Sequence, residues 1–183
     1  MKNQIQKVNK LQKNLTLTGM MGVGKTSIGK KLAKRLKYSF IDIDEIIEKK
    51  EGQTINLIFK NKGEDYFRKI ERDITLSELK KNKCVISLGG GAFVNKTIRE
   101  TAKKLSVSFW LDVPIEKLIK RLKKSKKRPL LNKENKIDNI KQIYFERKKI
   151  YNQANYKIKC ERLSAKEVAE KILNFYETSR NQI

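Results

Sequence analysis

Apolar residues recur along this chain either in short alternating runs or at intervals of three and four residues. In Asn14–Thr18, Leu alternates with Thr, a pattern that favours a β-strand. In the segment 27–36, Ile28, Leu32 and Leu36 lie four residues apart, on one face of a helix. The sequence therefore predicts a strand, a short glycine-rich connection and a helix at the start of its folded part.

The same two patterns predict the remaining secondary structure. Further strands are expected at 38–42, 84–88, 107–111 and 156–160, and further helices at 43–50, 55–59, 63 to about 82, 95–104, 137–151 and 165–176, with one more that begins at Pro114. Thr54 and Ser164 are expected helix N-caps, and Gly52 is an expected helix end. Five strands, most of them joined by helices, predict an α/β domain: a five-stranded parallel sheet with helices on both faces.

The same profile predicts the domain organisation. Residues 1–13 are polar and rich in Lys and are expected to form an N-terminal extension, 14–177 a single domain, and 178–183 a C-terminal tail. The sequence contains neither a run of 18 apolar residues nor an apolar signal core, so we expect no membrane span and no secretion. Cys84 and Cys160 fall in apolar-rich segments, which favours free buried thiols in a reducing cytoplasm.

The chain carries a formal net charge of +24 at pH 7 and contains no His, which excludes His-based catalysis and His metal sites. A charge of this size usually suggests nucleic acid as a partner. However, Lys outnumbers Arg 35 to 9 along the whole chain, and basic residues interleaved with aromatic ones are missing. We therefore expect no specific nucleic-acid partner. Because Arg is scarce, each Arg is a candidate for a position that needs a planar guanidinium fork.

The segment Gly19–Thr26, GMMGVGKT, matches the phosphate-binding pattern G-x-x-x-x-G-K-[ST] between the first predicted strand and helix. Glycines allow backbone N–H groups to surround phosphate oxygens, and the helix N-terminus adds partial positive charge. We expect Lys25 to contact the β- and γ-phosphates and the Thr26 hydroxyl to bind Mg²⁺. The residues of this loop expected to bind ATP are Gly22, Val23, Gly24, Lys25, Thr26 and Ser27. A chance glycine-rich turn is the weaker interpretation, because strand, loop and helix are all in place.

Two carboxylates end the second predicted strand, at the sheet edge where open α/β folds bind ligands. Asp42 and Asp44 are two residues apart, so on a strand they would point to the same side. One could hold Mg²⁺ through water, and the other could accept a hydrogen bond from an attacking hydroxyl. The alternative is that Asp44 merely begins a helix, where the dipole favours a carboxylate.

Two later segments offer groups for an anionic ligand. On a predicted helix, Arg68 lies one turn from both Glu64 and Glu71, which indicates either an exposed ion-pair ladder or a carboxylate-binding fork. The run Gly89, Gly90 and Gly91 follows a strand and lets a ligand approach the main chain, although a simple tight turn is the alternative.

Three further candidate Arg residues lie in the second half of the chain. The segment 123–131, KKSKKRPLL, is predicted to be a mobile basic flap that could carry Arg128 onto the transferred phosphoryl group. The lysines of this segment are also compatible with a solvated charge run. Arg147 is a single Arg on a Lys-rich helix, with a plain helix surface as the alternative, and Arg121 precedes the flap and could stack on a base.

Taken together, these segments resemble the shikimate kinase family. The matching segments are GMMGVGKTSIGKKLAKRL, FIDIDEIIE, GEDYFRKIE, SLGGGAF, KKRPLL and the helix that contains Arg147. They follow the order and approximate spacing of the family and cover roughly residues 14–177. The ordered set is far more specific than the phosphate-binding loop alone.

The resemblance implies ATP-dependent phosphorylation of shikimate at its 3-hydroxyl, in aromatic amino-acid biosynthesis. It implies a three-layer P-loop NTPase-like domain with a mobile lid, ATP as co-substrate and Mg²⁺ as cofactor. The implied catalytic residues are Lys25, Asp44 and Arg128, and Arg121 and Arg128 join the ATP-binding residues. The implied metal site is Thr26 with Asp42 through water, and the implied substrate-binding residues are Asp44, Arg68, Glu71, Gly89, Gly90, Gly91 and Arg147. The family's adenine contact before the last helix has no clear match, since Leu163 or Ser164 falls there.

Other functions are compatible with parts of this pattern. A kinase of another small hydroxy acid such as gluconate, or of a nucleotide, would carry the same loop. A catalytically silent nucleotide-binding member and a nucleic-acid-binding protein are more distant alternatives. We expect a cytoplasmic, monomeric kinase whose partners are shikimate and ATP, without a membrane partner.

Overall fold

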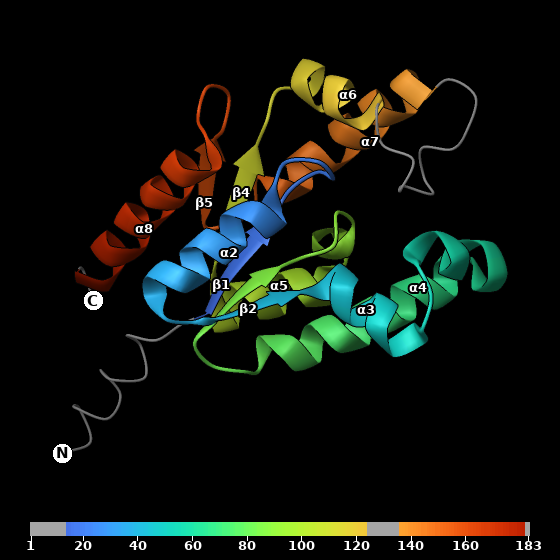
Figure 1. The fold of residues 1–183 in the computed structure, drawn as a ribbon, viewed down its shortest axis with the longest axis horizontal. Coiled ribbons are helices and arrows are strands. Elements are labelled where there is room, and N and C mark those ends of the chain that lie inside the picture. The colour runs from blue at the N-terminus through green and yellow to red at the C-terminus, as the bar shows by residue number, and fades with distance from the viewer. Residues whose placement is uncertain (1–13, 124–135, 182–183) are drawn as a thin grey trace.

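The computed structural model describes residues 14–123 and 136–181 (Figure 1). One five-stranded sheet forms its centre, in the order β2-β3-β1-β4-β5, and every neighbouring pair is parallel. The strands are β1 (Asn14–Thr18), β2 (Ser39–Asp42), β3 (Cys84–Ser87), β4 (Ser106–Asp112) and β5 (Tyr156–Lys159). The predicted parallel sheet is therefore confirmed, with strand ends that agree within one or two residues.

The helices also follow the predicted pattern, except that the last helix continues to Asn181 and so includes part of the segment 178–183 that was expected to be a tail. They are α2 (Lys25–Leu36), α3 (Ile43–Glu51), α4 (Ile55–Leu79), the short 3₁₀ helix η1 (Ala92–Val94), α5 (Lys96–Leu105), α6 (Ile115–Lys123), α7 (Lys136–Tyr151) and α8 (Ala165–Asn181). The element labelled α4 consists of two helical segments that meet at a kink at Gly63, where φ is 81° and ψ is 173°, in agreement with the two helices expected at 55–59 and from 63. Glycine tolerates this positive φ without a steric penalty, so the chain can leave the helical conformation at this one residue and begin a second helical segment.

Helices cover both faces of the sheet because side chains alternate along each strand. Leu17 of β1 faces α2, where the missing side chain of Gly29 leaves room for close packing. Its neighbour Thr16 faces the other way and lies 2.9 Å, oxygen to oxygen, from Ser106, whose hydroxyl donates to the Ala102 carbonyl in α5. Helices α2 and α8 therefore pack together on one face, and α4 and α5 pack together on the other (Figure 1).

The parallel arrangement brings the carboxyl ends of all five strands to one edge. The loop after β1, the end of β2 and the glycine turn after β3 all lie there, because β1, β2 and β3 are neighbours in the sheet. The predicted binding groups of these three segments are thus collected by topology alone. Within 14–123 and 136–181, no helix has both the length and the apolar character that a membrane crossing requires.

Candidate active site

The loop between β1 and α2 has the backbone of a phosphate-binding loop. Gly19, Gly22 and Gly24 have φ values of 135°, 80° and 97°, which non-glycine residues rarely adopt. A Cβ atom on Gly19 would lie 2.8 Å from the Leu111 carbonyl oxygen of the neighbouring strand. Glycine is therefore required both for the turn and for the approach of the loop to the sheet.

Two basic side chains donate hydrogen bonds to the main chain of this loop. The Lys25 ammonium donates to the carbonyls of Gly19 at 2.9 Å and Met20 at 3.1 Å, so it lies across the mouth of the loop. Arg121, from α6, donates through Nη1 to the Gly22 carbonyl at 3.1 Å. The cavity beside them is lined by Gly22, Gly24, Lys25, Thr26, Asp42, Asp44, Ser87 and Leu88. Four of the six loop residues predicted to bind ATP thus line this cavity, while Val23 and Ser27 are not part of its lining. Arg121 contacts the loop at Gly22.

Asp42 joins the end of β2 to this loop. Its Oδ2 accepts a hydrogen bond from the Thr26 hydroxyl at 2.7 Å, and its Oδ1 accepts from the backbone N–H of Asp44 at 3.1 Å as the N-cap of α3. A hydroxyl and a carboxylate at this distance form a suitable pair of oxygen ligands for Mg²⁺ or for its bound water.

Asp44 lies in the first turn of α3, so the expectation that it shares a strand face with Asp42 is wrong. The strand ends at Asp42, because its side chain caps the helix that follows. The alternative, that Asp44 begins a helix, is correct for the local structure. The helix begins at the carboxyl edge of the sheet, however, and both carboxylates still line the same cavity.

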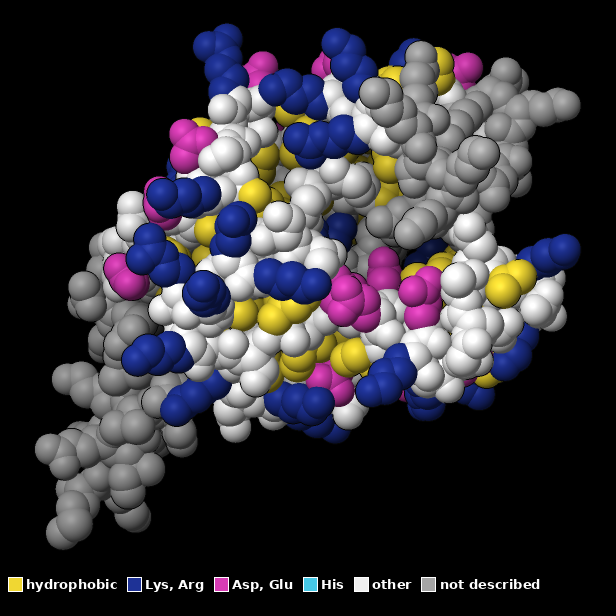
Figure 2. Space-filling model, viewed as in Figure 1, with side chains coloured by type: hydrophobic (Ala, Val, Ile, Leu, Met, Phe, Trp, Pro, Cys, Tyr) yellow, Lys and Arg dark blue, Asp and Glu magenta, His cyan; other side chains and the backbone are white. Residues whose placement is uncertain are grey.

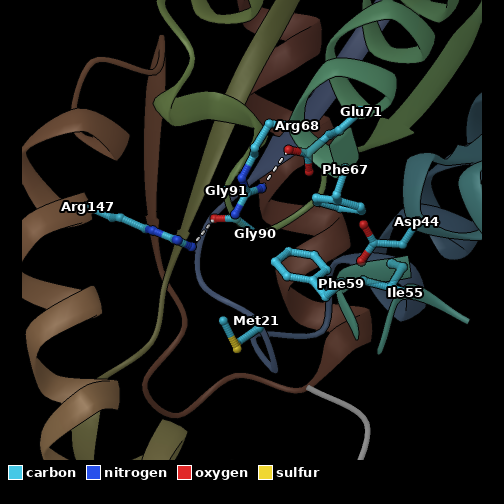
Figure 3. A pocket seen from close by; sticks show the side chains of 10 residues that line it. All are labelled: Met21, Asp44, Ile55, Phe59, Phe67, Arg68, Glu71, Gly90, Gly91 and Arg147. Carbon is cyan, nitrogen blue, oxygen red and sulfur yellow. Dashed lines mark hydrogen bonds and ion pairs between the residues drawn. The ribbon is translucent and has the colours of Figure 1, made fainter. Parts of the chain in front are cut away.

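A second cavity lies next to the first and carries the predicted substrate-binding groups (Figure 3). Its lining residues are Met21, Asp44, Ile55, Phe59, Phe67, Arg68, Glu71, Gly90, Gly91 and Arg147. In α4, Arg68 donates to Glu71 at 2.7 Å (Nη1 to Oε2) and to Glu64 at 3.0 Å (Nη2 to Oε1). Glu64 is half exposed, but Glu71 is buried, with 3% of its side chain accessible. The ion pair of Arg68 with Glu64 is therefore exposed, as in a surface ladder, whereas its ion pair with Glu71 lines a cavity.

The glycine turn allows these charged side chains to reach the main chain. A Cβ on Gly89 would lie 2.3 Å from Glu71 Oε1 and 2.9 Å from Asp44 Oδ1, and a Cβ on Gly91 would lie 2.5 Å from Arg68 Nη1. Any side chain at Gly89 or Gly91 would displace them. The close-approach interpretation of the three glycines is thus favoured over a simple turn.

The charges in this cavity influence one another. Burial raises the pKa of the Glu71 carboxyl, and the nearby Asp44 carboxylate raises it further, while Arg68 and Arg147 act in the opposite direction. Burial alone would lower the pKa of Arg68, but its ion pairs with Glu71 and Glu64 raise it instead. Two Arg side chains therefore offset the charge of the acidic pair Glu71 and Asp44.

Arg147 enters this cavity from α7, far from Arg68 in the sequence. Its Nη1 donates to the Gly90 carbonyl at 3.0 Å, and Figure 3 shows it reaching the glycine turn from the side opposite α4. Tyr151, one turn later in α7, donates to the same carbonyl. The structure thus places Arg68 and Arg147 on two sides of one turn.

Some functional positions lie outside the prediction or outside the described residues. Arg128 and most of the predicted flap belong to 124–135, which the structure does not describe. The apolar lining by Met21, Ile55, Phe59 and Phe67 was not predicted, because apolar residues at helical spacing are usual in a core. Tyr151 was also missed, although its position four residues after Arg147 places it on the same helix face.

A phosphate-binding loop on a parallel sheet, beside a small cavity with paired guanidinium groups, defines a P-loop kinase of a small anionic acceptor. The comparisons with known proteins specify this class. A family model described as shikimate kinase matches residues 21–177. The chain is 41% identical to the shikimate kinase of Sulfurihydrogenibium sp., over 88% of this chain and 96% of the relative. It is also 41% identical to the shikimate kinase of Thermodesulfovibrio yellowstonii, over 92% and 98%.

Comparison with solved structures indicates the same family. A shikimate kinase from Acinetobacter baumannii in complex with shikimate superposes with a TM-score of 0.89 at 33% identity, over 94% of this chain and 97% of the other. A gluconokinase from Sinorhizobium meliloti shares the fold with a TM-score of 0.59, but only 15% identity. The chain belongs to the shikimate kinase family. It is an enzyme that transfers the γ-phosphoryl group of ATP to the 3-hydroxyl of shikimate, a step of aromatic amino-acid biosynthesis.

Proposed function

We propose that the two adjoining cavities are the ATP half and the shikimate half of one active site, with Asp44 between them. The observation that carries this proposal is that Asp44 lines both cavities. A hydroxyl that donates a hydrogen bond to Asp44 would face the phosphate-binding loop. Phosphoryl transfer depends mainly on such positioning and on stabilisation of charge, so one carboxylate at the junction is well placed to orient the nucleophile.

On the ATP side, backbone N–H groups from Gly22 to Ser27 would surround the phosphates at the start of α2. Lys25 would exchange its contacts with the Gly19 and Met20 carbonyls for the β- and γ-phosphate oxygens. Arg121 lies against the loop and would contact the nucleotide from α6. We retain Arg128 as the lid arginine by resemblance to the family.

The residues present fit a magnesium ion. Thr26 and Asp42 offer a hydroxyl and a carboxylate 2.7 Å apart, and Mg²⁺ is commonly held by one or two carboxylates together with substrate phosphates and water. Bound there, the ion would supply positive charge to the transferred phosphoryl group. Thr26 would be its direct ligand, and Asp42 would orient a water of its shell.

On the acceptor side, Arg68 and Arg147 would bind the shikimate carboxylate, because paired guanidinium forks match carboxylate geometry. Glu71 would hold Arg68 in position through their 2.7 Å ion pair. The main chain of Gly89, Gly90 and Gly91 would lie beside the ligand. Asp44 would accept a hydrogen bond from the 3-hydroxyl and take its proton late in the transfer.

We further propose that the enzyme acts in the cytoplasm as a monomer, without a specific nucleic-acid partner. The two cysteines are free and buried, as is usual in a reducing compartment. On the face drawn in Figure 2, Lys and Arg side chains are spread over most of the surface, while several acidic side chains gather in one area near the middle. A spread of this kind is consistent with a compositional bias toward Lys. Sedimentation at physiological salt, with and without duplex DNA, tests the monomeric state and the lack of a nucleic-acid partner.

The assignment of the carboxylate clamp is tested by Arg147→Lys, which keeps the charge and removes the fork. We expect the KM for shikimate to rise by about 10- to 100-fold, with smaller changes in kcat and in the KM for ATP. Arg72→Lys is the matched control, since Arg72 lies in α4 and pairs with Asp73 at the surface. Normal kinetics for Arg147→Lys would remove Arg147 from the clamp.

A further inference from the structure

Tyr151 is a buried residue whose hydroxyl group has no role in the function proposed above. It ends α7, and only 1% of it is exposed. Its ring lies near Trp110, with centroids 6.2 Å apart and planes tilted by 34°. Its hydroxyl donates to the Gly90 carbonyl and lies 3.9 Å from the sulfur of Met20 in the phosphate-binding loop. The hydroxyl therefore contacts the glycine turn of the shikimate half and lies close to the loop of the ATP half.

The Gly90 carbonyl has two donors, and both come from the same face of α7. Arg147 and Tyr151 are four residues apart, which places their side chains one above the other on the helix. A carbonyl oxygen has two lone pairs, so the two donors together satisfy it. The turn is thus fixed to α7 at one atom, beside the point where Gly91 packs against Arg68.

This shared carbonyl has a consequence for Arg147. To grip a carboxylate with both arms of its fork, Arg147 must turn at least partly away from Gly90. If it were the single donor, that movement would leave a part-buried carbonyl without a partner, and the loss would oppose ligand binding. Because Tyr151 also donates to that oxygen, the carbonyl stays paired when Arg147 moves.

We infer that Tyr151 is a positioning residue for shikimate: its hydroxyl holds the Gly90 carbonyl and thereby releases Arg147 to bind the substrate carboxylate. This inference rests on the proposed role of Arg147 in the clamp. Tyr151 itself need not touch either substrate. Its effect is expected in the affinity for the acceptor and not in the chemical step.

The test is Tyr151→Phe, which keeps the ring against Trp110 and removes only the hydroxyl. We expect the KM for shikimate to rise by roughly 5- to 20-fold, in line with the loss of one hydrogen bond to a group used in binding. The kcat and the KM for ATP should stay within about twofold of wild type. Tyr144→Phe is the matched control, because it also removes a tyrosine hydroxyl from α7. That hydroxyl lies 3.4 Å from Asp112 Oδ1 and does not contact Gly90.

A double-mutant cycle separates positioning from independent packing. In the Arg147→Lys background, Tyr151→Phe should raise the KM for shikimate by less than about threefold further, because both changes act through the same atom. An unchanged KM in Tyr151→Phe, an equal rise in Tyr144→Phe, or effects that multiply in the double variant would each overturn the inference. If Arg147→Lys alone leaves the KM unchanged, the proposed clamp fails, which is a different result from failure of Tyr151→Phe alone. Thermal unfolding of the four variants and of the wild-type protein detects a loss of fold.

Discussion

The two halves of the proposed active site are built in different ways. The phosphate half comes from one eight-residue loop, the start of α2 and the end of β2, and its shape is set by backbone conformation. The acceptor half is assembled from α3, α4, the glycine turn after β3, and α7, and its shape is set by charged side chains packed against glycine. A local motif can define a phosphate site, whereas recognition of a particular acceptor requires segments that only the tertiary fold brings together.

This difference predicts how each half fails. In the phosphate half, removal of a single charged group should abolish activity without changing the conformation of the loop. Glycines and the helix N-terminus maintain that conformation. The acceptor half should be sensitive to added volume, because Glu71, Asp44 and Arg68 already fill the space that a Cβ at Gly89 or Gly91 would need.

The largest effect is expected for Lys25→Ala. Removal of the ammonium deletes a charge that would stabilise the transferred phosphoryl group, so kcat should fall by about 10³-fold or more. The melting temperature should change little, since the Lys25 ammonium donates to two carbonyls of its own loop, those of Gly19 and Met20. Lys31→Ala, an exposed position on the same helix, is the control for charge alone. A coupled ADP-release assay measures the rates, and a kcat near wild type would contradict the role of Lys25.

Gly89→Ala is expected to have the next largest effect, and it tests the acceptor half. The methyl group would displace Glu71 and Asp44, so kcat/KM for shikimate should fall by about 10²-fold while the KM for ATP stays near wild type. Gly90→Ala provides a graded comparison, because its Cβ would meet nothing closer than the Met21 nitrogen at 3.3 Å. Equal effects of the two substitutions on steady-state kinetics would argue against steric displacement as the cause.

Asp42→Asn should shift the metal dependence of the phosphate half. The amide keeps the shape of the side chain but loses the negative charge that accepts the Thr26 hydrogen bond and would orient metal-bound water. Half-maximal activity should therefore need about tenfold more Mg²⁺. Titration of MgCl₂ at fixed ATP measures this shift. Asp65→Asn, an exposed carboxylate in α4, should leave the Mg²⁺ requirement unchanged. An unaltered requirement in Asp42→Asn would remove Asp42 from the metal site.

The smallest effect concerns the buried thiol of Cys160, which directly follows the edge strand β5. Burial raises the pKa of the Cys160 thiol to about 11, and the charge of Asp112 contributes to the rise. Because a raised pKa disfavours the thiolate, only about 0.1% of the thiol is ionised at pH 8, and labelling should still accelerate above pH 9. Ellman's reagent should therefore react slowly with native protein and rapidly with two thiols in denaturant. Fast labelling of a variant would show that its core has opened.

The conformation of the phosphate-binding loop follows from one sequence motif, whereas Asp42, Ser87 and Leu88, which line the same cavity, come from the ends of two other strands. The acceptor half was predicted as a set of residues through the order of the segments and the scarcity of Arg, but not as a geometry. Asp44 shows the limit: its spacing from Asp42 suggested a strand face, whereas the Asp42 side chain ends the strand by capping α3. Periodicity alone does not reveal where a side chain will terminate an element.

Two further features depended on tertiary contacts. Phe59 and Phe67 are apolar at helical spacing, and only the kink of α4 at Gly63 and the position of Arg68 beside both rings show that they line a cavity. Tyr151 gave no signal of its own, because its partner is a backbone carbonyl sixty-one residues earlier in the chain. Contacts between distant main-chain and side-chain atoms follow from the packing of α7 against the turn and not from any local pattern.

The most direct test of the account is calorimetric titration of shikimate into Lys25→Ala and Arg147→Lys, each with and without MgADP. If the two halves are separate sites that meet at Asp44, Lys25→Ala should bind shikimate with wild-type affinity although it does not turn over. Arg147→Lys should bind MgADP normally and shikimate at least about tenfold more weakly. Normal shikimate binding by Arg147→Lys together with lost binding by Lys25→Ala would contradict the account, because it would place the acceptor at the phosphate loop and not at the arginine pair.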